Sequence, residues 1–304
     1  MGSEPELSAG LPGSPPARAA HETGTVPAAA SPGVPMPAAA QRVGVWRTLR
    51  GMWRLARAVV HGVHGLLVVL LRFPGLDAAG RHARISWWSA KMLRMLGARL
   101  EVQGHFRPGA KLIVANHISW LDIMAIHAVC PQARFVSKAE VHHWPLVGRL
   151  VSSAGTLYIE RERRRDSLRV MHHMAEALAA GHTVAVFPEG TTGDGQALLP
   201  FHANLLQSAI ATATPVQPVA LRFSDDRFEV SPSALFLGET TLAQSLWHLA
   251  CSQGLVVTVR VLSAEATAHA DRRALALHLR EQIAQALPDL QSYDSAGGTR
   301  RFAP

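Results

Sequence analysis

The sequence predicts an α/β fold with a mixed, largely parallel central sheet flanked by helices, preceded by an N-terminal membrane-associated helical segment. After Gly97, short β-type runs alternate with longer helical patterns, which is typical of a sheet with parallel strands. Before Gly97, the chain is both basic and strongly apolar. Charged residues make up 17% of the chain, below the roughly 25% of an ordinary soluble domain, so part of its surface is expected to face something other than water.

Composition divides the chain into four regions. Residues 1–45 are rich in Pro and Ala without apolar periodicity, which indicates a disordered tail rather than a signal peptide. Residues 46–97 are basic and apolar and are expected to form membrane-anchoring helices. Residues 98–287 carry the alternating pattern of the α/β domain, and residues 288–304 are expected to form a loose C-terminal tail.

The first apolar helix is expected over residues 46–73. Its uncharged run, Ala58 to Leu71, would be about 21 Å long as a helix, whereas the hydrocarbon core of a bilayer is about 30 Å thick. The flanking side chains of Arg57 and Arg72 could snorkel to the interface. We therefore expect an interfacial or partly inserted anchor helix. A full crossing and a buried core helix are the alternatives.

A second basic amphipathic helix is expected over residues 78–97. Apolar residues recur there at spacings of three and four, as they do on one face of a helix. Trp87 and Trp88 suit the headgroup region of a membrane. An ordinary surface helix packed on a core is the alternative.

Positive charge is concentrated in this front region. Between residues 42 and 99 there are eleven Lys and Arg and one acid, Asp77, whereas the whole chain has a formal net charge of +8. Cations interleaved with Trp, Leu and Val indicate an anionic membrane surface as partner. Nucleic acid is not an expected partner, because no module signature accompanies the charge. The eleven cations are Arg42, Arg47, Arg50, Arg54, Arg57, Arg72, Arg81, Arg84, Lys91, Arg94 and Arg99.

The elements of the α/β domain follow from period and composition. The expected strands are Arg99–Val102, Leu112–Ala115, Arg134–Val136, Leu157–Ile159, Thr183–Phe187, Val216–Leu221, Phe228–Val230 and Val256–Leu262. The expected helices lie near residues 120–130, 144–153, 164–180, 203–213, 241–252 and 270–286. No internal repeat is present in the sequence.

The two cysteines, Cys130 and Cys251, lie far apart without a second thiol near either. This spacing predicts neither a disulfide framework nor a zinc cluster, and we expect structural thiols in a reducing compartment. No metal site is expected.

The first candidate for chemistry is Asn116–Asp122, with the sequence NHISWLD, where an apolar strand leads into a helix. His117 at a strand end could act as a general base on an alcohol, with Asp122 fixing its tautomer. On a continuous helix a spacing of five would put the two side chains about 140° apart. They can therefore meet only if His117 lies in the turn and Asp122 in the first helical turn. Alternatively, Ser119 and Asp122 form a capping box.

Three further motifs lie C-terminal to the first. Phe187–Thr192, with the sequence FPEGTT, is a turn after an apolar strand that carries one carboxylate and a glycine; a turn with a solvated Glu is the alternative. Gly155–Arg161 ends in an arginine that could clamp a phosphate or carboxylate, followed by three arginines that would also suit a solvated helix start. Pro218 within Val216–Ala220 suggests an edge strand or a bend.

Together these four motifs resemble the 1-acylglycerol-3-phosphate acyltransferase (lysophospholipid acyltransferase) family, from about residue 98 to 225. The resemblance implies that residues 98–287 are an acyltransferase domain in which His117 and Asp122 are the catalytic pair. The other residues that it implies in the site bind substrate: Arg161, Glu189, Gly190 and Thr191, with Pro218 linked to the acyl-donor site. The stretch FVSKAEV at residues 135–141 also resembles the family, which implies that Lys138 binds substrate.

One departure concerns the acceptor. Many phosphatidate-forming members of the family have Arg after Glu-Gly-Thr, whereas this chain has Thr192. The run from Phe187 to His202 resembles more closely the branch that acylates lyso-ornithine lipid or other lysolipids. The expected acceptor is therefore 1-acylglycerol-3-phosphate or lyso-ornithine lipid.

The implied activity is transfer of a fatty acyl group from an acyl-carrier-protein or acyl-CoA thioester to the hydroxyl of a lysolipid. His117 would be the base, no cofactor would be needed beyond the acyl thioester as co-substrate, and the enzyme would act at the cytoplasmic face of the inner membrane. A lipid esterase and a non-catalytic membrane-binding protein are the alternatives. The sequence contains no Gly-x-Ser-x-Gly elbow, which disfavours the esterase.

Overall fold

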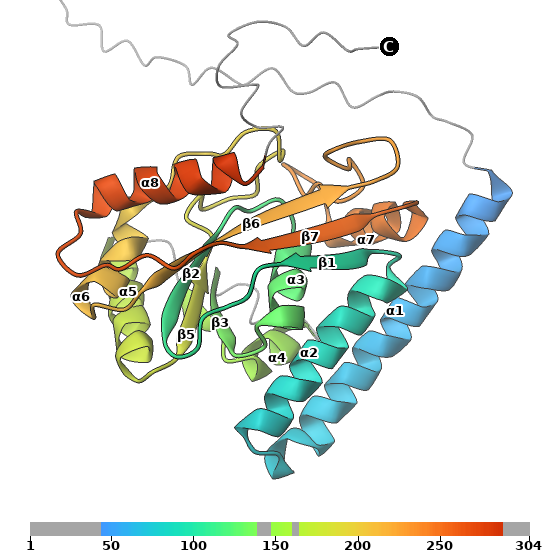
Figure 1. The fold of residues 1–304 in the computed structure, drawn as a ribbon. Helices are drawn as coiled ribbons and strands as arrows, with labels where there is room; N and C mark the ends of the chain where they lie inside the picture. Colours follow the sequence, from blue (N-terminus) through green and yellow to red (C-terminus); the bar gives the residue numbers. More distant parts are fainter. Residues whose placement is uncertain (1–43, 139–146, 160–163, 288–304) are drawn as a thin grey trace, which may run out of the picture. The chain divides into compact units, whose positions relative to one another are not determined.

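The computed structural model describes residues 44–138, 147–159 and 164–287. The tails expected at 1–45 and 288–304 lie outside these residues, apart from residues 44 and 45. Within the described residues, helices and strands alternate after residue 98 in an α/β arrangement (Figure 1).

The described strands form one seven-stranded sheet in the order β1-β7-β6-β2-β5-β3-β4. Their bounds are β1 Arg99–Gln103, β2 Lys111–Ala115, β3 Ala133–Lys138, β4 Leu157–Ile159, β5 Thr183–Val186, β6 Val216–Ser224 and β7 Val256–Val261. Neighbouring strands run parallel except for β6 and β7, which are antiparallel. The expected mixed, largely parallel sheet is therefore confirmed.

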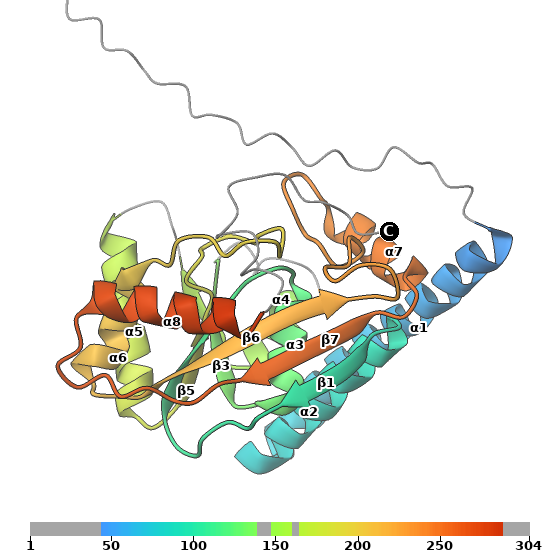
Figure 2. The same cartoon turned by 45° about the horizontal axis from the view of Figure 1, so that its top comes forward.

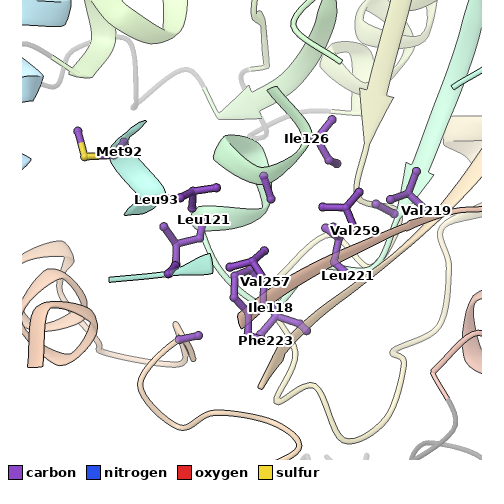
Figure 3. Close-up of a cluster of buried hydrophobic side chains, with 14 of the residues drawn as sticks. Met92, Leu93, Ile118, Leu121, Ile126, Val219, Leu221, Phe223, Val257 and Val259 are labelled. Carbon is purple, nitrogen blue, oxygen red and sulfur yellow. The ribbon is translucent and has the colours of Figure 1, made fainter. Parts of the chain in front are cut away.

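The sheet carries helices on both faces, because alternate residues of its strands belong to two cores. One core joins β6 and β7 to α2 (Ala78–Met95), α3 (Leu121–Val129) and α7 (Leu242–Cys251) through Leu93, Leu121, Phe223 and Val257 (Figure 3). The other joins β2, β5 and β6 to α5 (Arg164–Ala179), α6 (Gln207–Ala211) and α8 (Arg272–Gln285). Burial of apolar side chains in these two layers is what fixes the sheet.

The remaining helices are α1 (Val45–Leu71), α4 (Val147–Ser153) and the short 3-10 turns η1 (Phe73–Gly75) and η3 (Ala203–Leu206). The helix expected near 203–213 is thus divided into η3 and α6. Helices α1 and α2 lie side by side as an antiparallel hairpin next to β1 (Figure 2).

One expected strand is wrong, and so is the edge-strand alternative for Pro218. Residues 228–230 do not form a strand, because the side chain of Asp225 accepts hydrogen bonds from the backbone N–H groups of Arg227 and Phe228 and turns the chain back. Pro218 does not lie on an edge strand, since β6 is interior, between β7 and β2. Its missing N–H is tolerated because the carbonyl of Leu262, whose own N–H donates to the Pro218 carbonyl, accepts instead from the side-chain amide of Gln217 at 3.1 Å.

Helix α1 buries mostly small residues against the rest of the protein and exposes large apolar side chains. Gly51, Ala58, His61 and Gly65 are its buried residues. Its exposed large side chains form one stripe along the helix: Val45, Trp46, Leu49, Met52, Trp53, Val59, Val60, Val63, Leu67, Leu70 and Leu71. By length and composition α1 is a candidate membrane span, and 17% of its most apolar window is buried inside the protein.

The inner face of α1 is attached to the α/β domain by polar contacts. Arg47 donates to the carbonyl of Cys251, and Arg54 donates to those of Ala250 and Ser252 at the end of α7. Guanidinium groups thus satisfy carbonyls that a helix C-terminus leaves unpaired. Two of the eleven clustered cations, Arg47 and Arg54, therefore stabilise the packing of α1 on α7.

Reciprocal hydrogen bonds join α1 to α2. The Nε1–H of Trp88 donates to the carbonyl of His61 at 3.1 Å, and His61 Nε2 lies 3.0 Å from the carbonyl of Trp88. Close approach depends on Gly65, because a Cβ there would lie 2.2 Å from Trp88 Nε1. The hairpin is therefore a packed unit, in which the α2 tryptophan is inserted against α1.

Candidate active site

The candidate active site lies where two parallel neighbours, β2 and β5, end. β2 ends at Ala115, directly before the segment 116–122, and β5 ends at Val186, directly before 187–192. Because the carboxyl ends of parallel strands meet at one edge of a sheet, the two motifs come together across 72 residues of sequence.

His117 and Asp122 are in direct contact. His117 Nδ1 lies 2.7 Å from Asp122 Oδ2. His117 precedes α3 and Asp122 is its second residue, so the pair meets by the turn-then-helix arrangement that its spacing requires. The Asp122 side chain is fully buried, whereas 20% of the His117 side chain is exposed. The pair thus has a buried carboxylate and a ring that solvent or substrate can reach.

Asp122 Oδ2 also accepts hydrogen bonds from the backbone N–H groups of Ile118 (2.7 Å) and Ser119 (2.9 Å). One oxygen of Asp122 therefore contacts two backbone N–H groups and the ring nitrogen of His117. Of the two bonds of the capping-box alternative, the one from the Ser119 N–H to Asp122 is present, whereas the Ser119 hydroxyl has no partner among the described residues, so the box is not complete. Asp122 instead fixes the turn that carries His117.

Glu189 reaches the same turn from the second motif. Its Oε1 accepts from the backbone N–H of His117 at 2.7 Å, and its Oε2 accepts from that of Leu199 at 2.9 Å. The residue is buried, with 5% of its surface exposed. Burial raises the pKa of Glu189, while the hydrogen bonds from Leu199 and His117 oppose the rise. The expected alternative of a solvated Glu in a turn is therefore wrong.

The second motif surrounds His117 on further sides. The ring of Phe187 stacks on the His117 ring, with centroids 4.1 Å apart and an interplanar angle of 8°. The backbone N–H of Gly193 donates to the His117 carbonyl at 2.7 Å. Both backbone polar groups of His117 and one ring face are thus held by residues 187–193.

The other predicted residues of this motif differ in exposure. Gly190 has φ of +73°, a conformation that favours glycine, and a Cβ there would lie 3.1 Å from the ring of His202. Thr191 is exposed. The hydroxyl of Thr192 donates to the carbonyl of Phe236, so Thr192 ties this turn to the connection between β6 and α7.

The structure does not unite every predicted site residue. Arg161 lies outside the described residues, and for Lys138, at the end of β3, only the backbone is described. Pro218 is buried within β6 opposite Val114, in the strands rather than at the edge where His117 lies. Its predicted link with the acyl-donor site remains a prediction.

Two residues of the site were not predicted individually. Asn116 is buried, and its side chain pairs with both the backbone N–H and the carbonyl of Leu221, which extends β2 against β6 before the His117 turn. Arg280 in α8 donates to the carbonyls of Leu198 and Leu199 beside Glu189. A polar residue directly after an apolar strand could have indicated Asn116, whereas no local signal marks Arg280.

The arrangement is suited to proton abstraction. With Nδ1 directed at Asp122, the Nε2 atom of His117 has no hydrogen-bond partner within the described part of the chain. A carboxylate on Nδ1 fixes the proton there, leaves the lone pair on Nε2 and stabilises the imidazolium after proton uptake. The N–H groups of residues 117–119 are already bonded to carboxylates, so an oxyanion would need other donors.

Comparison with known proteins shows which family the chain resembles. The family model described as Acyltransferase matches residues 99–222. The chain is 36% identical over 217 residues to the lyso-ornithine lipid O-acyltransferase of Pseudomonas aeruginosa, covering 71% of this chain and 83% of that protein. It is 38% identical over 185 residues to the 1-acyl-sn-glycerol-3-phosphate acyltransferase of Neisseria gonorrhoeae, covering 60% and 71%.

Among solved structures, the fold is similar to that of the 1-acyl-sn-glycerophosphate (LPA) acyltransferase from Thermotoga maritima. The TM-score is 0.57, and the match covers 79% of this chain and 98% of that chain. Sequence identity is 19%, so this likeness concerns the fold alone.

Proposed function

The chain belongs to the 1-acylglycerol-3-phosphate acyltransferase family, and from this premise we propose that it transfers a fatty acyl group from a thioester to a lysolipid hydroxyl with His117 as general base. It is an acyltransferase of the lysophosphatidate or lyso-ornithine lipid type, and its relatives place it in lipid biosynthesis. The observation that supports the role of His117 is its 2.7 Å contact with buried Asp122.

In the proposed reaction His117 Nε2 takes the proton of the acceptor hydroxyl while the oxygen attacks the thioester carbonyl carbon. The tetrahedral intermediate collapses, the C–S bond breaks, and the thiolate takes the proton from the imidazolium. Asp122 keeps the ring in the reactive tautomer and stabilises its charged form. Glu189 and Phe187 hold His117 in place, so the ring need not reorganise during the reaction.

We propose lyso-ornithine lipid as the acceptor, with 1-acylglycerol-3-phosphate as the second candidate. At the position after Glu-Gly-Thr the chain has a hydroxyl that is used within the protein, since Thr192 bonds to the carbonyl of Phe236. A neutral, occupied side chain supplies no charge to a phosphate. The sequence similarity to the enzyme of Pseudomonas aeruginosa supports the same choice.

We further propose that α1 lies in the surface of a membrane rather than across it. Its inner face is packed on α2 and α7, and its outer stripe is apolar throughout its length. A helix attached along its length to a domain cannot cross a bilayer without taking that domain with it. An in-plane orientation places the stripe in lipid. We also propose that the membrane surface is anionic and that the protein lies on its cytoplasmic face. The acyl donor in this proposal is acyl-carrier-protein or acyl-CoA.

The test is a transfer assay with purified protein on phosphatidylglycerol vesicles and labelled acyl thioester. Lyso-ornithine lipid and 1-acylglycerol-3-phosphate are offered separately, each with acyl carrier protein or coenzyme A as donor. Diacylated product from lyso-ornithine lipid alone is expected. Product from 1-acylglycerol-3-phosphate alone would reverse the acceptor assignment, and free fatty acid formed at the same rate without acceptor would indicate an esterase.

A further inference from the structure

The guanidinium of Arg280 holds two consecutive carbonyls of the loop that follows the second motif. Its Nη2 donates to the carbonyl of Leu198 at 2.5 Å, and its Nε donates to that of Leu199 at 3.2 Å. Arg280 is partly buried in α8, 81 residues from Leu199 along the chain. A planar fork with fixed donors defines the position of both carbonyls, which a single flexible ammonium would not.

The same loop peptide contacts Glu189 on its opposite side. The peptide unit between residues 198 and 199 has the Leu198 carbonyl at one end and the Leu199 N–H at the other. The carbonyl accepts from Arg280, and the N–H donates to Glu189 Oε2 at 2.9 Å. One planar trans peptide therefore connects a cation to a buried carboxylate, and each hydrogen bond polarises the next.

The other oxygen of Glu189 accepts from the backbone N–H of His117 at 2.7 Å. A continuous series of hydrogen bonds thus leads from Arg280 through the Leu198–Leu199 peptide and Glu189 to His117. Each oxygen of Glu189 holds one backbone N–H, so a shift of the loop at Leu199 would move or release the carboxylate that sets the His117 turn.

We propose that Arg280 is a positioning residue for the acyl-transfer reaction, acting on His117 through the Leu198–Leu199 peptide and Glu189. The inference rests on the proposed role of His117 as base. It adds a residue of α8 to the site, outside residues 99–222 that the family model matches.

The experiment compares Arg280→Met, Arg280→Lys and the control Arg272→Met, which removes an exposed arginine from the same helix. Initial rates and thermal stability are measured for each purified variant on vesicles. Arg280→Met should lower kcat about tenfold or more, with KM for the acyl thioester changed less than about twofold, because catalytic alignment is lost while donor contacts remain. Arg280→Lys should recover part of kcat, and Arg272→Met should match the parent protein.

A double-mutant cycle with Glu189→Gln distinguishes positioning from a merely structural role. In the Glu189→Gln background the series of bonds is already broken, so Arg280→Met should lower single-turnover rates by less than about twofold further. If Arg280→Met and Glu189→Gln lower the rate by independent factors that multiply in full, the proposal is overturned. It is also overturned if Arg280→Met retains the kcat of the parent protein. His117→Ala is assayed in parallel. Acyl transfer by His117→Ala would contradict the proposed function. An inactive His117→Ala together with a fully active Arg280→Met would contradict this inference alone.

Discussion

The carboxylate of Glu189 accepts a hydrogen bond from the backbone N–H of His117 at 2.7 Å. A side chain of the second motif thus holds the main chain of the first motif directly. The resemblance to the family implied that Glu189 binds the acceptor. In the structure both of its oxygens are bonded to backbone N–H groups and 5% of its surface is exposed. These contacts place Glu189 as a support for the His117 turn, and the predicted part of Glu189 in acceptor binding remains a prediction.

Glu189→Gln separates these two roles. A glutamine has one acceptor oxygen, so its NH2 group would face the N–H of either His117 or Leu199, which leaves that buried donor unsatisfied. We expect kcat to fall about 100-fold through misalignment of His117, with little change in KM for the lysolipid. Steady-state kinetics with varied acceptor checks this. A raised acceptor KM at unchanged kcat would instead mean that Glu189 contacts the acceptor.

The apolar stripe of α1 predicts how the protein binds membranes. Val60 in the stripe and Leu277 on α8 are 68% and 69% exposed, so a glutamate at either position is equally accessible. Val60→Glu should weaken binding to phosphatidylglycerol vesicles about tenfold or more, because a charge would enter the acyl region. Leu277→Glu should bind as the parent does. Cosedimentation measures both, and equal losses would show that the stripe is not the bound face.

Two glycines of α1 predict opposite effects on stability. A Cβ at Gly62 would meet nothing within 4 Å, whereas one at Gly65 would lie 2.2 Å from Trp88 Nε1. Gly62→Ala should raise the free energy of unfolding by up to about 1 kcal/mol through helix propensity. Gly65→Ala should lower it by about 1–3 kcal/mol through overpacking. Urea denaturation tests the pair, and a stabilising Gly65→Ala would contradict the packed hairpin.

His127 predicts a loss of stability in acid. Burial lowers its pKa to about 4, and its Nε2 lies 3.0 Å from the carbonyl of Ala133. Between pH 6.5 and about 4 the unfolded chain binds a proton at this site that the folded protein does not, so stability falls as pH falls. The loss should be on the order of 3 kcal/mol. His127→Gln cannot titrate and should show a correspondingly flatter profile in denaturation measured from pH 7 to 4; the same slope as the parent would contradict a buried neutral His127.

Patterns of short range predicted most of the fold and the centre of the site. The apolar strand before Asn116 and the spacing of His117 and Asp122 predicted a turn-then-helix arrangement, which the structure has. Residues 228–230 looked like a strand because their composition is β-type, but the Asp225 side chain turns the chain there. Local side-chain capping by Asp225 outweighed strand propensity.

Contacts made by backbone groups could not be predicted in this way. Arg280 and Arg54 bind carbonyls distant in sequence, and a carbonyl has no residue type by which a pattern could reveal it. The sequence pattern predicts a membrane surface as the partner of all the clustered cations, whereas Arg47 and Arg54 donate to carbonyls at the end of α7. Such pairings depend on the tertiary arrangement of α1, α7 and α8.

The most direct test of the account is the single-turnover transfer rate of His117→Ala on vesicles with labelled acyl thioester and lyso-ornithine lipid. The parent protein and the variant are matched for folding by thermal denaturation and for vesicle binding by cosedimentation. We predict a fall of about 10³-fold or more, with both controls unchanged, because the base is removed while the rest of the site remains. A variant that folds, binds vesicles and transfers the acyl group within about tenfold of the parent rate would contradict the assignment of His117 as the base.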